Sequence, residues 1–311
     1  MRVITDAEVG AVLDLATTTD WLERALGDLG RQRAASSIRV RATTGGAMAS
    51  ALAAAWPDGG VTGGKVYATK DGVLTFLVAV FDLDGRLLAV MEGDTLTRIR
   101  TAAGTGVALR HLLARPPEVV TVIGTGRQCR QHLELVAAEL PGVGEVRIVG
   151  RRPGPRDTAV RAAVELELPA VGMADPVEAV QDAGVVITLT SASRPLFPGD
   201  RLPDGALVCA LGATKHDRQE LGPDTVARAG TVVVDSLEGS RTECGDLIAA
   251  AAAGSFRWDD ALELAPVVAD PALVAGRTGH DVVLFESQGI ALQDIVAAAI
   301  VVERIGTGVR A

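Results

Sequence analysis

The chain has 311 residues, of which 48% are hydrophobic, enough for two domains with a core in each. Its formal net charge of −9 argues against nucleic acids and anionic membranes as partners, because both would repel an acidic protein. The three cysteines (Cys129, Cys209 and Cys244) form no disulfide framework, and no uncharged apolar run approaches the roughly 18 residues of a membrane span. These features predict a cytoplasmic protein.

The first third of the chain is predicted to combine helices with a small sheet. Residues 37–43 alternate with period two, which predicts a strand with Arg39 and Arg41 on one face. The glycine-rich stretch 57–64 is predicted to be a flexible loop, followed by a three-stranded meander with Asp-Gly turns. We expect helices at 5–15 and 21–30 and meander strands at 65–70, 73–81 and 87–91.

A long helix is predicted over residues 96–110, with Thr97 or Thr101 as its N-terminal cap. Arg100 then falls in the first turn, where the positive end of the helix dipole opposes a cation. A cation in that place suggests that an anion binds nearby. The alternative is a solvated arginine without a partner.

The most informative stretch is 118–132, which reads as a buried strand, a turn with Gly124 and Gly126, and a helix start. Two glycines in this context let the backbone approach a pyrophosphate, which the free N–H groups of the helix N-terminus can bind. The third glycine of the fingerprint is replaced by Cys129, so an ordinary strand–turn–helix connection is the alternative. We predict a dinucleotide-binding turn.

The second strand of this unit, residues 145–150, is followed by Arg151 and Arg152. NAD-binding proteins usually have an acidic residue there, which accepts hydrogen bonds from the ribose hydroxyls. Guanidinium groups would instead pair with a 2′-phosphate through charge-assisted hydrogen bonds. The sequence therefore predicts NADP(H) in preference to NAD(H), with a solvated basic loop as the alternative.

Apolar strands alternate with helices over residues 119–285, which predicts a doubly wound α/β domain. Ligands of such sheets bind beyond the carboxyl ends of the strands, where Thr190, Ser191, Gly212 and Asp235 are expected. A helix at 289–305 is predicted to close the chain and to pack back on the first domain.

Several motifs together resemble those of the ornithine cyclodeaminase/mu-crystallin family. They are Lys65 after the glycine-rich stretch, Leu96-Thr-Arg-Ile-Arg-Thr-Ala-Ala103, Ile123-Gly-Thr-Gly-Arg-Gln128, Thr188-Leu-Thr-Ser191, Gly212 with Glu220-Leu221, Val232-Val-Val-Asp-Ser236 and Phe285-Glu-Ser-Gln-Gly-Ile-Ala-Leu-Gln-Asp294. The resemblance implies a homodimer. It also implies a dimerisation and substrate-binding domain at 1–115 with 289–311, and a Rossmann-type NAD(P)-binding domain at 116–288.

The resemblance implies that Lys65, Arg100 and Arg39 form the catalytic site, in which the arginines hold a substrate carboxylate and the lysine handles a proton. Arg41 is an alternative to Arg39, because it shares the same strand face. The predicted cofactor-binding residues are Gly124, Thr125, Gly126, Arg127, Gln128, Arg151, Arg152, Thr190, Ser191, Gly212, Asp235, Ser287 and Gly289. No metal site is predicted.

The family includes cyclodeaminases, alanine dehydrogenases, cyclic ketimine reductases and a hormone-binding crystallin. Cyclodeaminases have an acidic residue before the methionine that matches Met48 and an aspartate at the position of Thr214, whereas this chain has Gly46-Ala47 and Thr214. We therefore predict an NAD(P)H-dependent oxidoreductase that acts on the C–N bond of a small α-imino or α-amino acid. The alternatives are an ornithine cyclodeaminase and an NADPH-bound carrier without turnover. His216, in the same loop as Thr214, is either a proton donor or a surface histidine.

Overall fold

The computed structural model describes residues 2–276 and 280–306. They fall into two compact units. Unit 1 holds residues 2–107, 268–270 and 289–306, and unit 2 holds residues 108–267 and the described part of 271–288. The division after residue 107 lies inside a long helix, whereas the sequence analysis placed it after residue 115. Residues 307–311 of the predicted first domain lie outside the described residues.

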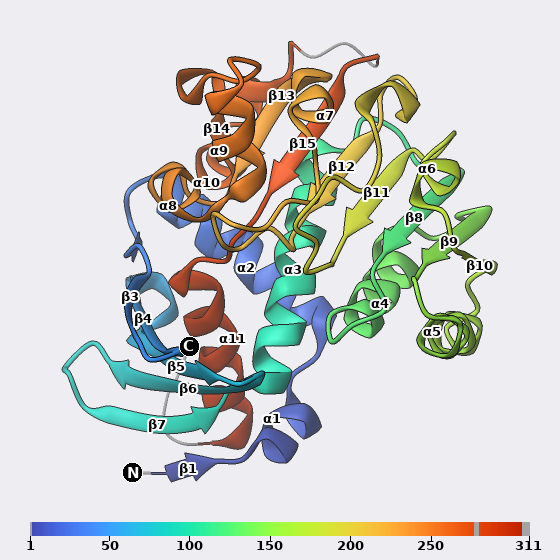
Figure 1. Ribbon diagram of the computed structural model, residues 1–311. Helices are drawn as coiled ribbons and strands as arrows, with labels where there is room; N and C mark the ends of the chain where they lie inside the picture. The colour runs from blue at the N-terminus through green and yellow to red at the C-terminus, as the bar shows by residue number, and fades with distance from the viewer. Residues whose placement is uncertain (1, 277–279, 307–311) are drawn as a thin grey trace. The chain divides into compact units, whose positions relative to one another are not determined.

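Unit 1 contains a seven-stranded sheet in the order β1-β7-β6-β5-β4-β2, with β3 paired to β4 (Figure 1). The β5–β6–β7 meander was predicted correctly and is antiparallel, whereas β1 joins β7 in parallel. The strands are β1 (Arg2–Ile4), β2 (Ala35–Ser36), β3 (Val40–Thr44), β4 (Ala47–Trp56), β5 (Val61–Lys70), β6 (Val73–Asp82) and β7 (Leu87–Glu92).

The predicted flexible loop at 57–64 is wrong, because β5 already begins at Val61. Gly63 and Gly64 lie inside the strand, and the reason is close packing. A Cβ atom at Gly63 would lie 2.2 Å from the carbonyl oxygen of Ala79, and one at Gly64 would lie 2.9 Å from that of Leu52. These glycines are therefore required by neighbouring strands rather than by a turn.

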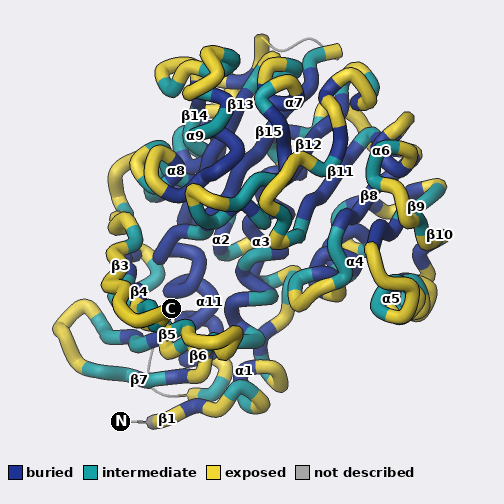
Figure 2. The backbone as a smooth tube through the Cα atoms, in the orientation of Figure 1, coloured by how far each residue is buried: buried dark blue, intermediate teal, exposed yellow. Residues whose placement is uncertain are grey.

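The main helices of unit 1 are α1 (Asp6–Val12), α2 (Leu15–Gly30), the first part of α3 (Asp94–Leu112) and α11 (Ala291–Ile305). Thr5 caps α1 through a capping box with Glu8, and Asp14 caps α2. The helix predicted over 5–15 therefore ends early, and the one predicted from residue 21 begins at residue 15. Helix α11 packs on α2, β4 and β5, as predicted, and almost its whole length is buried (Figure 2).

Unit 2 is built on an eight-stranded parallel sheet in the order β10-β9-β8-β11-β12-β15-β13-β14 (Figure 1). The order reverses between β8 and β11, so the predicted doubly wound fold is confirmed. The strands are β8 (Val119–Ile123), β9 (Glu145–Val149), β10 (Ala170–Met173), β11 (Val185–Thr188), β12 (Leu207–Ala210), β13 (Ala229–Val234), β14 (Leu262–Glu263) and β15 (Val282–Glu286).

The helices that follow these strands are α4 (Cys129–Glu139), α5 (Pro153–Glu165), α6 (Pro176–Ala179), α7 (Pro223–Ala227), α8 (Leu237–Glu243), α9 (Gly245–Ala252) and α10 (Leu264–Ala269). The strands β8, β11, β12 and β15 are buried along their whole length, because a parallel sheet is covered on both faces. The sequence analysis missed α7 to α10, since such short helices show little periodicity.

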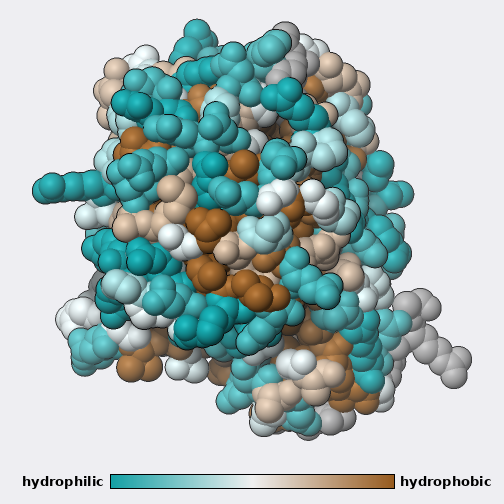
Figure 3. Space-filling view, turned by 90° about the vertical axis from the view of Figure 1, so that its right-hand side faces the viewer, coloured by the Kyte–Doolittle hydropathy of each residue, from teal (hydrophilic) through white to brown (hydrophobic). Residues whose placement is uncertain are grey.

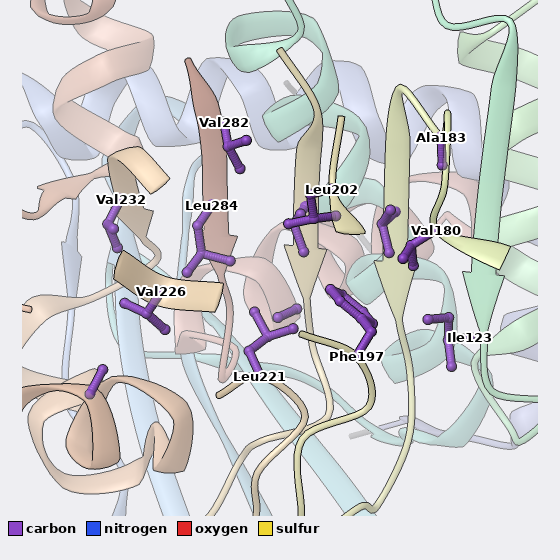
Figure 4. Packing of buried hydrophobic residues seen from close by; sticks show 14 of the residues in the cluster. Ile123, Val180, Ala183, Phe197, Leu202, Leu221, Val226, Val232, Val282 and Leu284 are labelled. Carbon is purple, nitrogen blue, oxygen red and sulfur yellow. The ribbon is translucent and has the colours of Figure 1, made fainter. Parts of the chain in front are cut away.

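One cluster of apolar side chains fills the space beside this sheet (Figure 4). Phe197 and Leu221 come from loops, Val226 comes from α7, and Leu284 comes from β15. Each such buried side chain contributes on the order of 1.5–3 kcal/mol to stability. The cluster therefore anchors the loops after β11 and β12 to the sheet. Hydrophilic side chains cover most of the face shown in Figure 3.

Candidate active site

A buried charge cluster in unit 1 joins β5, α3 and α11. Lys65 Nζ lies 2.9 Å from Asp294 Oδ1 and 2.7 Å from the hydroxyl of Thr97. Arg100 Nε donates to the same oxygen of Asp294 at 3.0 Å, and its Nη1 donates to Gln293 Oε1. Lys65, Arg100 and Asp294 are all less than 7% exposed. The three elements thus bring two cations onto one carboxylate.

Local structure explains these positions. Lys65 occupies an inward-facing position of β5, and the ring of Phe76 on β6 covers its ammonium group at 4.3 Å. Thr97 and Arg100 are three residues apart, so they share one face of α3. Asp294 is in the first turn of α11, where the helix dipole stabilises a negative charge.

Arg39 also reaches this cluster, through the backbone at the start of α11. Its Nη2 donates to the carbonyl oxygen of Gly289 at 2.9 Å. Gly289 has a φ of +81°, which favours glycine, and a Cβ atom there would lie 2.6 Å from Arg100 Nη1, so a side chain at this position would displace the guanidinium group. Arg39 precedes β3 rather than lying in it, and Arg41 is an exposed residue of β3. Of the two arginines, the structure brings Arg39 to the cluster.

The charges of this cluster shift the pKa of Lys65 and that of Asp294. Burial lowers the pKa of Lys65 from 10.5 to about 7; Asp294 counteracts this effect, whereas Arg100 and Arg39 add to it. Burial alone would raise the pKa of Asp294, but Arg100 and Lys65 outweigh it and hold that pKa below 3.8. With Lys65 protonated, three cations face one carboxylate. The cluster can therefore accept a further anion, and its lysine can exchange a proton near neutral pH.

Arg100 was predicted to need an anion because it would lie in the first turn of its helix. This reason is wrong, although Arg100 does pair with an acidic residue, Asp294. Helix α3 begins at Asp94, so Arg100 is in the second turn, beyond the strong part of the helix dipole. Thr97 and Thr101 do not cap the helix. The Thr97 hydroxyl donates to the carbonyl oxygen of Gly93, just before the helix, and the Thr101 hydroxyl donates to that of Thr97. Asp294 and Gln293, which sequence reasoning did not assign to the site, hold Arg100 instead.

The predicted dinucleotide turn lies in unit 2 between β8 and α4. Gly124 has a φ of +122°, and a Cβ atom there would lie 2.8 Å from the carbonyl oxygen of Leu189 in the loop after β11. Thr125, Gly126, Arg127 and Gln128 form the rest of the turn, and no side chain caps the N-terminus of α4. The structure thus places together a glycine turn, a helix N-terminus without a side-chain cap and the reversal of strand order, which are features of the predicted pyrophosphate site.

The position of the third fingerprint glycine is taken by Cys129, the first residue of α4. It is buried, and burial raises the pKa of its thiol to about 11. Cys129 therefore packs as a small apolar side chain.

Arg151 and Arg152 are exposed directly after β9. A Cβ atom at the preceding Gly150 would lie 2.8 Å from the Thr125 side chain, so the end of β9 adjoins the glycine turn. The two guanidinium groups therefore leave the backbone beside the predicted pyrophosphate site, which is where a 2′-phosphate would lie.

The other predicted cofactor residues follow four neighbouring strands. Thr190 and Ser191 follow β11, and Gly212 follows β12. Asp235 follows β13 and accepts a hydrogen bond of 2.8 Å from the hydroxyl of Ser287, which follows β15. Gly289 is the exception, because it lies with the charge cluster in unit 1. Glu220 was not among the predicted site residues. Its carboxylate accepts hydrogen bonds from backbone N–H groups of Thr190, after β11, and Gly212, after β12.

The remaining candidates are spread over separate elements. His216 is exposed in the loop after β12, while His132 is buried in α4, where burial lowers its pKa to about 4. Gly46 is in the exposed β3–β4 turn and Thr214 is half-buried near Gly212. Within residues 2–276 and 280–306, no group of three or more His, Cys, Asp or Glu side chains is arranged to hold a metal ion.

Comparison with known proteins agrees with these features. The model of the ornithine cyclodeaminase/mu-crystallin family matches residues 65–308. The chain belongs to this family. The predicted assignment to a nicotinamide-dependent oxidoreductase of this type is therefore confirmed. No helix in the described part of the chain is long and apolar enough to cross a membrane.

Three relatives cover most of the chain. Δ1-pyrroline-2-carboxylate reductase from Bacillus cereus is 33% identical over 226 residues, which are 71% of this chain and 67% of the relative. A solved structure of a probable ornithine cyclodeaminase from Bordetella pertussis is 34% identical, with a TM-score of 0.91 over 98% of this chain and 97% of that one. The iminosuccinate reductase of Paracoccus denitrificans, solved in complex with NAD⁺, is 27% identical, with a TM-score of 0.90 over 99% and 98% of the two chains.

Proposed function

We propose that the protein is an NADPH-dependent reductase of a small α-imino acid, which forms the corresponding α-amino acid and can run in reverse. The observation that carries this proposal is the buried cluster of Lys65, Arg100 and Asp294 with the half-buried Arg39 beside it, in which positive charge exceeds negative charge. Two of the relatives described above are named as reductases of pyrroline-2-carboxylate and iminosuccinate, which are both imino acids with a carboxylate.

Arg100 and Arg39 are proposed to hold the substrate carboxylate. Among the described residues, Arg100 uses Nε and Nη1 for protein partners, and its Nη2 has none. A substrate carboxylate beside Arg100 Nη2 would gain a charge-assisted hydrogen bond and would balance the excess positive charge of the cluster. Asp294 and Gln293 fix the guanidinium plane, so the substrate would bind in one orientation.

Lys65 is proposed to give the substrate nitrogen its proton during reduction. A group whose pKa is about 7 is half-protonated at neutral pH, which suits it to donate in one direction and accept in the other. Asp294 and Thr97 hold the ammonium group in place. The bound nicotinamide would supply the hydride that the α-carbon receives.

The cofactor is proposed to be NADP(H) rather than NAD(H). This preference is supported by Arg151 and Arg152, which are exposed at the end of β9, and by the absence of an acidic side chain over residues 149–152. The pyrophosphate is proposed to bind Gly124, Thr125, Gly126, Arg127 and Gln128. The nicotinamide half is proposed to bind near Thr190, Ser191 and Gly212, with Asp235 and Ser287 beside them.

The protein is also proposed to be a cytoplasmic homodimer, with unit 1 as its dimerisation and substrate-binding part. Exposed apolar side chains on the unit 1 sheet support a partner there, among them Val40, Val66, Val73 and Leu77. Three buried free cysteines agree with a reducing compartment.

Two other functions are less well supported. An ornithine cyclodeaminase would need a receptor for the distal ammonium, but Gly46, Ala47 and Thr214 offer no carboxylate. We expect no proline or ammonia from ornithine with catalytic NAD(P)⁺, and steady release of both would establish cyclodeamination instead. A carrier without turnover would have little use for a buried lysine with a pKa near 7.

Oxidation of NADPH by a panel of imino acids tests the proposal. The panel should contain cyclic and acyclic imino acids, with the matching oxo acids without ammonia as controls. We expect at least one imino acid to be reduced with turnover. Tight NADPH binding without oxidation by any member would favour the carrier.

A further inference from the structure

Glu220 is a fully buried carboxylate of unit 2 that joins the loops after two neighbouring strands. Its Oε2 accepts hydrogen bonds of 2.7 Å from the Thr188 hydroxyl at the end of β11 and of 2.7 Å from the Gly212 backbone N–H after β12. Its Oε1 accepts the backbone N–H of Thr190 at 2.6 Å. One side chain thus satisfies three donors from two loops.

The two loops are also in direct contact beside this carboxylate. A Cβ atom at Gly212 would lie 2.0 Å from the carbonyl oxygen of Thr190 and 2.6 Å from Glu220 Oε2. No side chain larger than hydrogen therefore fits at Gly212 without moving the loop after β11. The spacing of the loops is set by Glu220 on one side and by this contact on the other.

The position of Glu220 is itself fixed by its neighbours. Its backbone N–H donates to Asp246 Oδ1 at 2.8 Å, in the first turn of α9, and its carbonyl oxygen accepts the N–H of Leu196 at 2.8 Å. Arg218, two residues earlier, donates to the carbonyl oxygen of Ser191 at 2.7 Å. The segment 218–220 therefore holds the loop after β11 at both Thr190 and Ser191.

Burying a carboxylate is costly, so its retention here needs a reason. Burial raises the pKa of Glu220, and the hydrogen bonds from Thr190, Thr188 and Gly212 counteract that rise. A glutamine could not replace it, because its amide has a single acceptor oxygen and its NH₂ group would face an N–H or O–H donor. The site is thus specific for an acceptor with two oxygens.

We propose that Glu220 is a positioning residue that sets the spacing of the loops after β11 and β12, and so holds Thr190, Ser191 and Gly212 in place for the nicotinamide ring. The proposal rests on the proposed function, because it requires a nicotinamide cofactor at the carboxyl ends of these strands. The loop after β11 also contacts Gly124, so it lies where the strand order reverses and such cofactors bind. Glu220 does not touch the cofactor in this account; it acts through the loops.

The test compares two ligands that differ only in the nicotinamide: NADPH and 2′-phospho-ADP-ribose. Glu220→Gln should weaken NADPH binding by about tenfold or more, since hydrogen bonds to a charged group are lost and the loops shift. Binding of 2′-phospho-ADP-ribose should change less than about twofold, because the Glu220 side chain bonds Thr188, Thr190 and Gly212 rather than the glycine turn or Arg151. Calorimetric titration of each ligand into each protein gives both values.

A second pair of variants covers the case in which Glu220→Gln fails to fold. Thr188→Val removes one donor to Glu220. The matched control is Thr121→Val on the neighbouring strand β8, which removes a buried hydrogen bond from the Thr121 hydroxyl to the carbonyl oxygen of Ala179 in α6. Thr188→Val should show the same selective loss for NADPH at smaller size, and Thr121→Val should not.

The proposal is overturned if the variants bind NADPH as the parent does, or if both ligands weaken equally. Equal weakening would mean that Glu220 supports the whole unit rather than the nicotinamide loops. A parent protein that binds neither ligand would instead contradict the proposed function itself.

Discussion

Lys65 Nζ and Asp294 Oδ1 are 2.9 Å apart in a fully buried ion pair, although 229 residues separate them in the chain. Arg100 shares the same carboxylate oxygen. A buried ion pair is a costly feature that proteins rarely keep for stability alone. Here it counteracts the effect of burial on the proton affinity of the lysine, which is the property on which the proposed reaction depends.

The ion pair predicts a pH dependence for imino acid reduction. Below a pKa of about 7 Lys65 carries the proton that the substrate nitrogen needs, and above it the proton is lost. kcat/KM for reduction should therefore fall about tenfold per pH unit above pH 7, whereas kcat/KM for amino acid oxidation, which needs the neutral amine, should rise about tenfold per pH unit below pH 7 and level off above it. Initial rates between pH 5.5 and 9, with cofactor saturating, measure both limbs.

Asp294→Asn should move the fall in the reduction rate to lower pH. The carboxylate raises the pKa of Lys65, and without it the lowering effect of Arg100 and Arg39 would be unopposed. Loss of a neighbouring charge typically changes a pKa by about 1–3 units. Thr97→Val is the matched control, since it removes a neutral hydrogen-bond partner of the same ammonium and should shift the limb less. An unchanged limb in Asp294→Asn would show that another group supplies the proton.

Arg100→Leu should reduce substrate capture while NADPH binding stays at the parental level. A lost charged hydrogen bond of roughly 3 kcal/mol corresponds to about a hundredfold in kcat/KM. Lys65→Ala should differ in kind and lower kcat more than it raises KM, because proton transfer matters in the transition state. Parental kcat/KM in Arg100→Leu would place the carboxylate elsewhere, with Arg41 as the next residue to change.

Arg151→Ala should remove much of the preference for NADPH over NADH. A charge-assisted pair with the 2′-phosphate is worth on the order of 1.5–3 kcal/mol, which is a factor of about ten to a hundred in affinity. Binding of NADH should stay nearly constant, which makes it the internal control. If the parent protein binds the two cofactors equally, the arginines have no role in cofactor choice.

Local signals in the sequence were sufficient for the parallel sheet and the glycine turn. Strands such as β8 and β11 are continuous apolar runs, and Gly124 needs a backbone conformation that few other residues adopt. The start of β5 was not predicted, because Gly63 and Gly64 are typical of a loop in the sequence. Only the structure shows that the backbones of Leu52 and Ala79 on neighbouring strands pack too closely for larger residues there.

The candidate site was only partly predictable, for a different reason. Lys65, Arg100 and Arg39 were found through a family resemblance, and Arg100 was explained by the wrong local effect. Asp294 is an acidic residue in an otherwise apolar helix, and no neighbouring residue in the sequence indicates which residues it contacts. Its role emerges only when β5, α3 and α11 are brought together.

Transfer of deuterium tests the central claim most directly. The protein would be incubated with the imino acid from the panel and with NADPH carrying deuterium on the transferred face of C4, and the amino acid product would be analysed by mass spectrometry and NMR. The account predicts one deuterium, located on the α-carbon, and none on the nitrogen after exchange. A product without deuterium at the α-carbon would contradict hydride transfer to the C–N bond as the function of this protein.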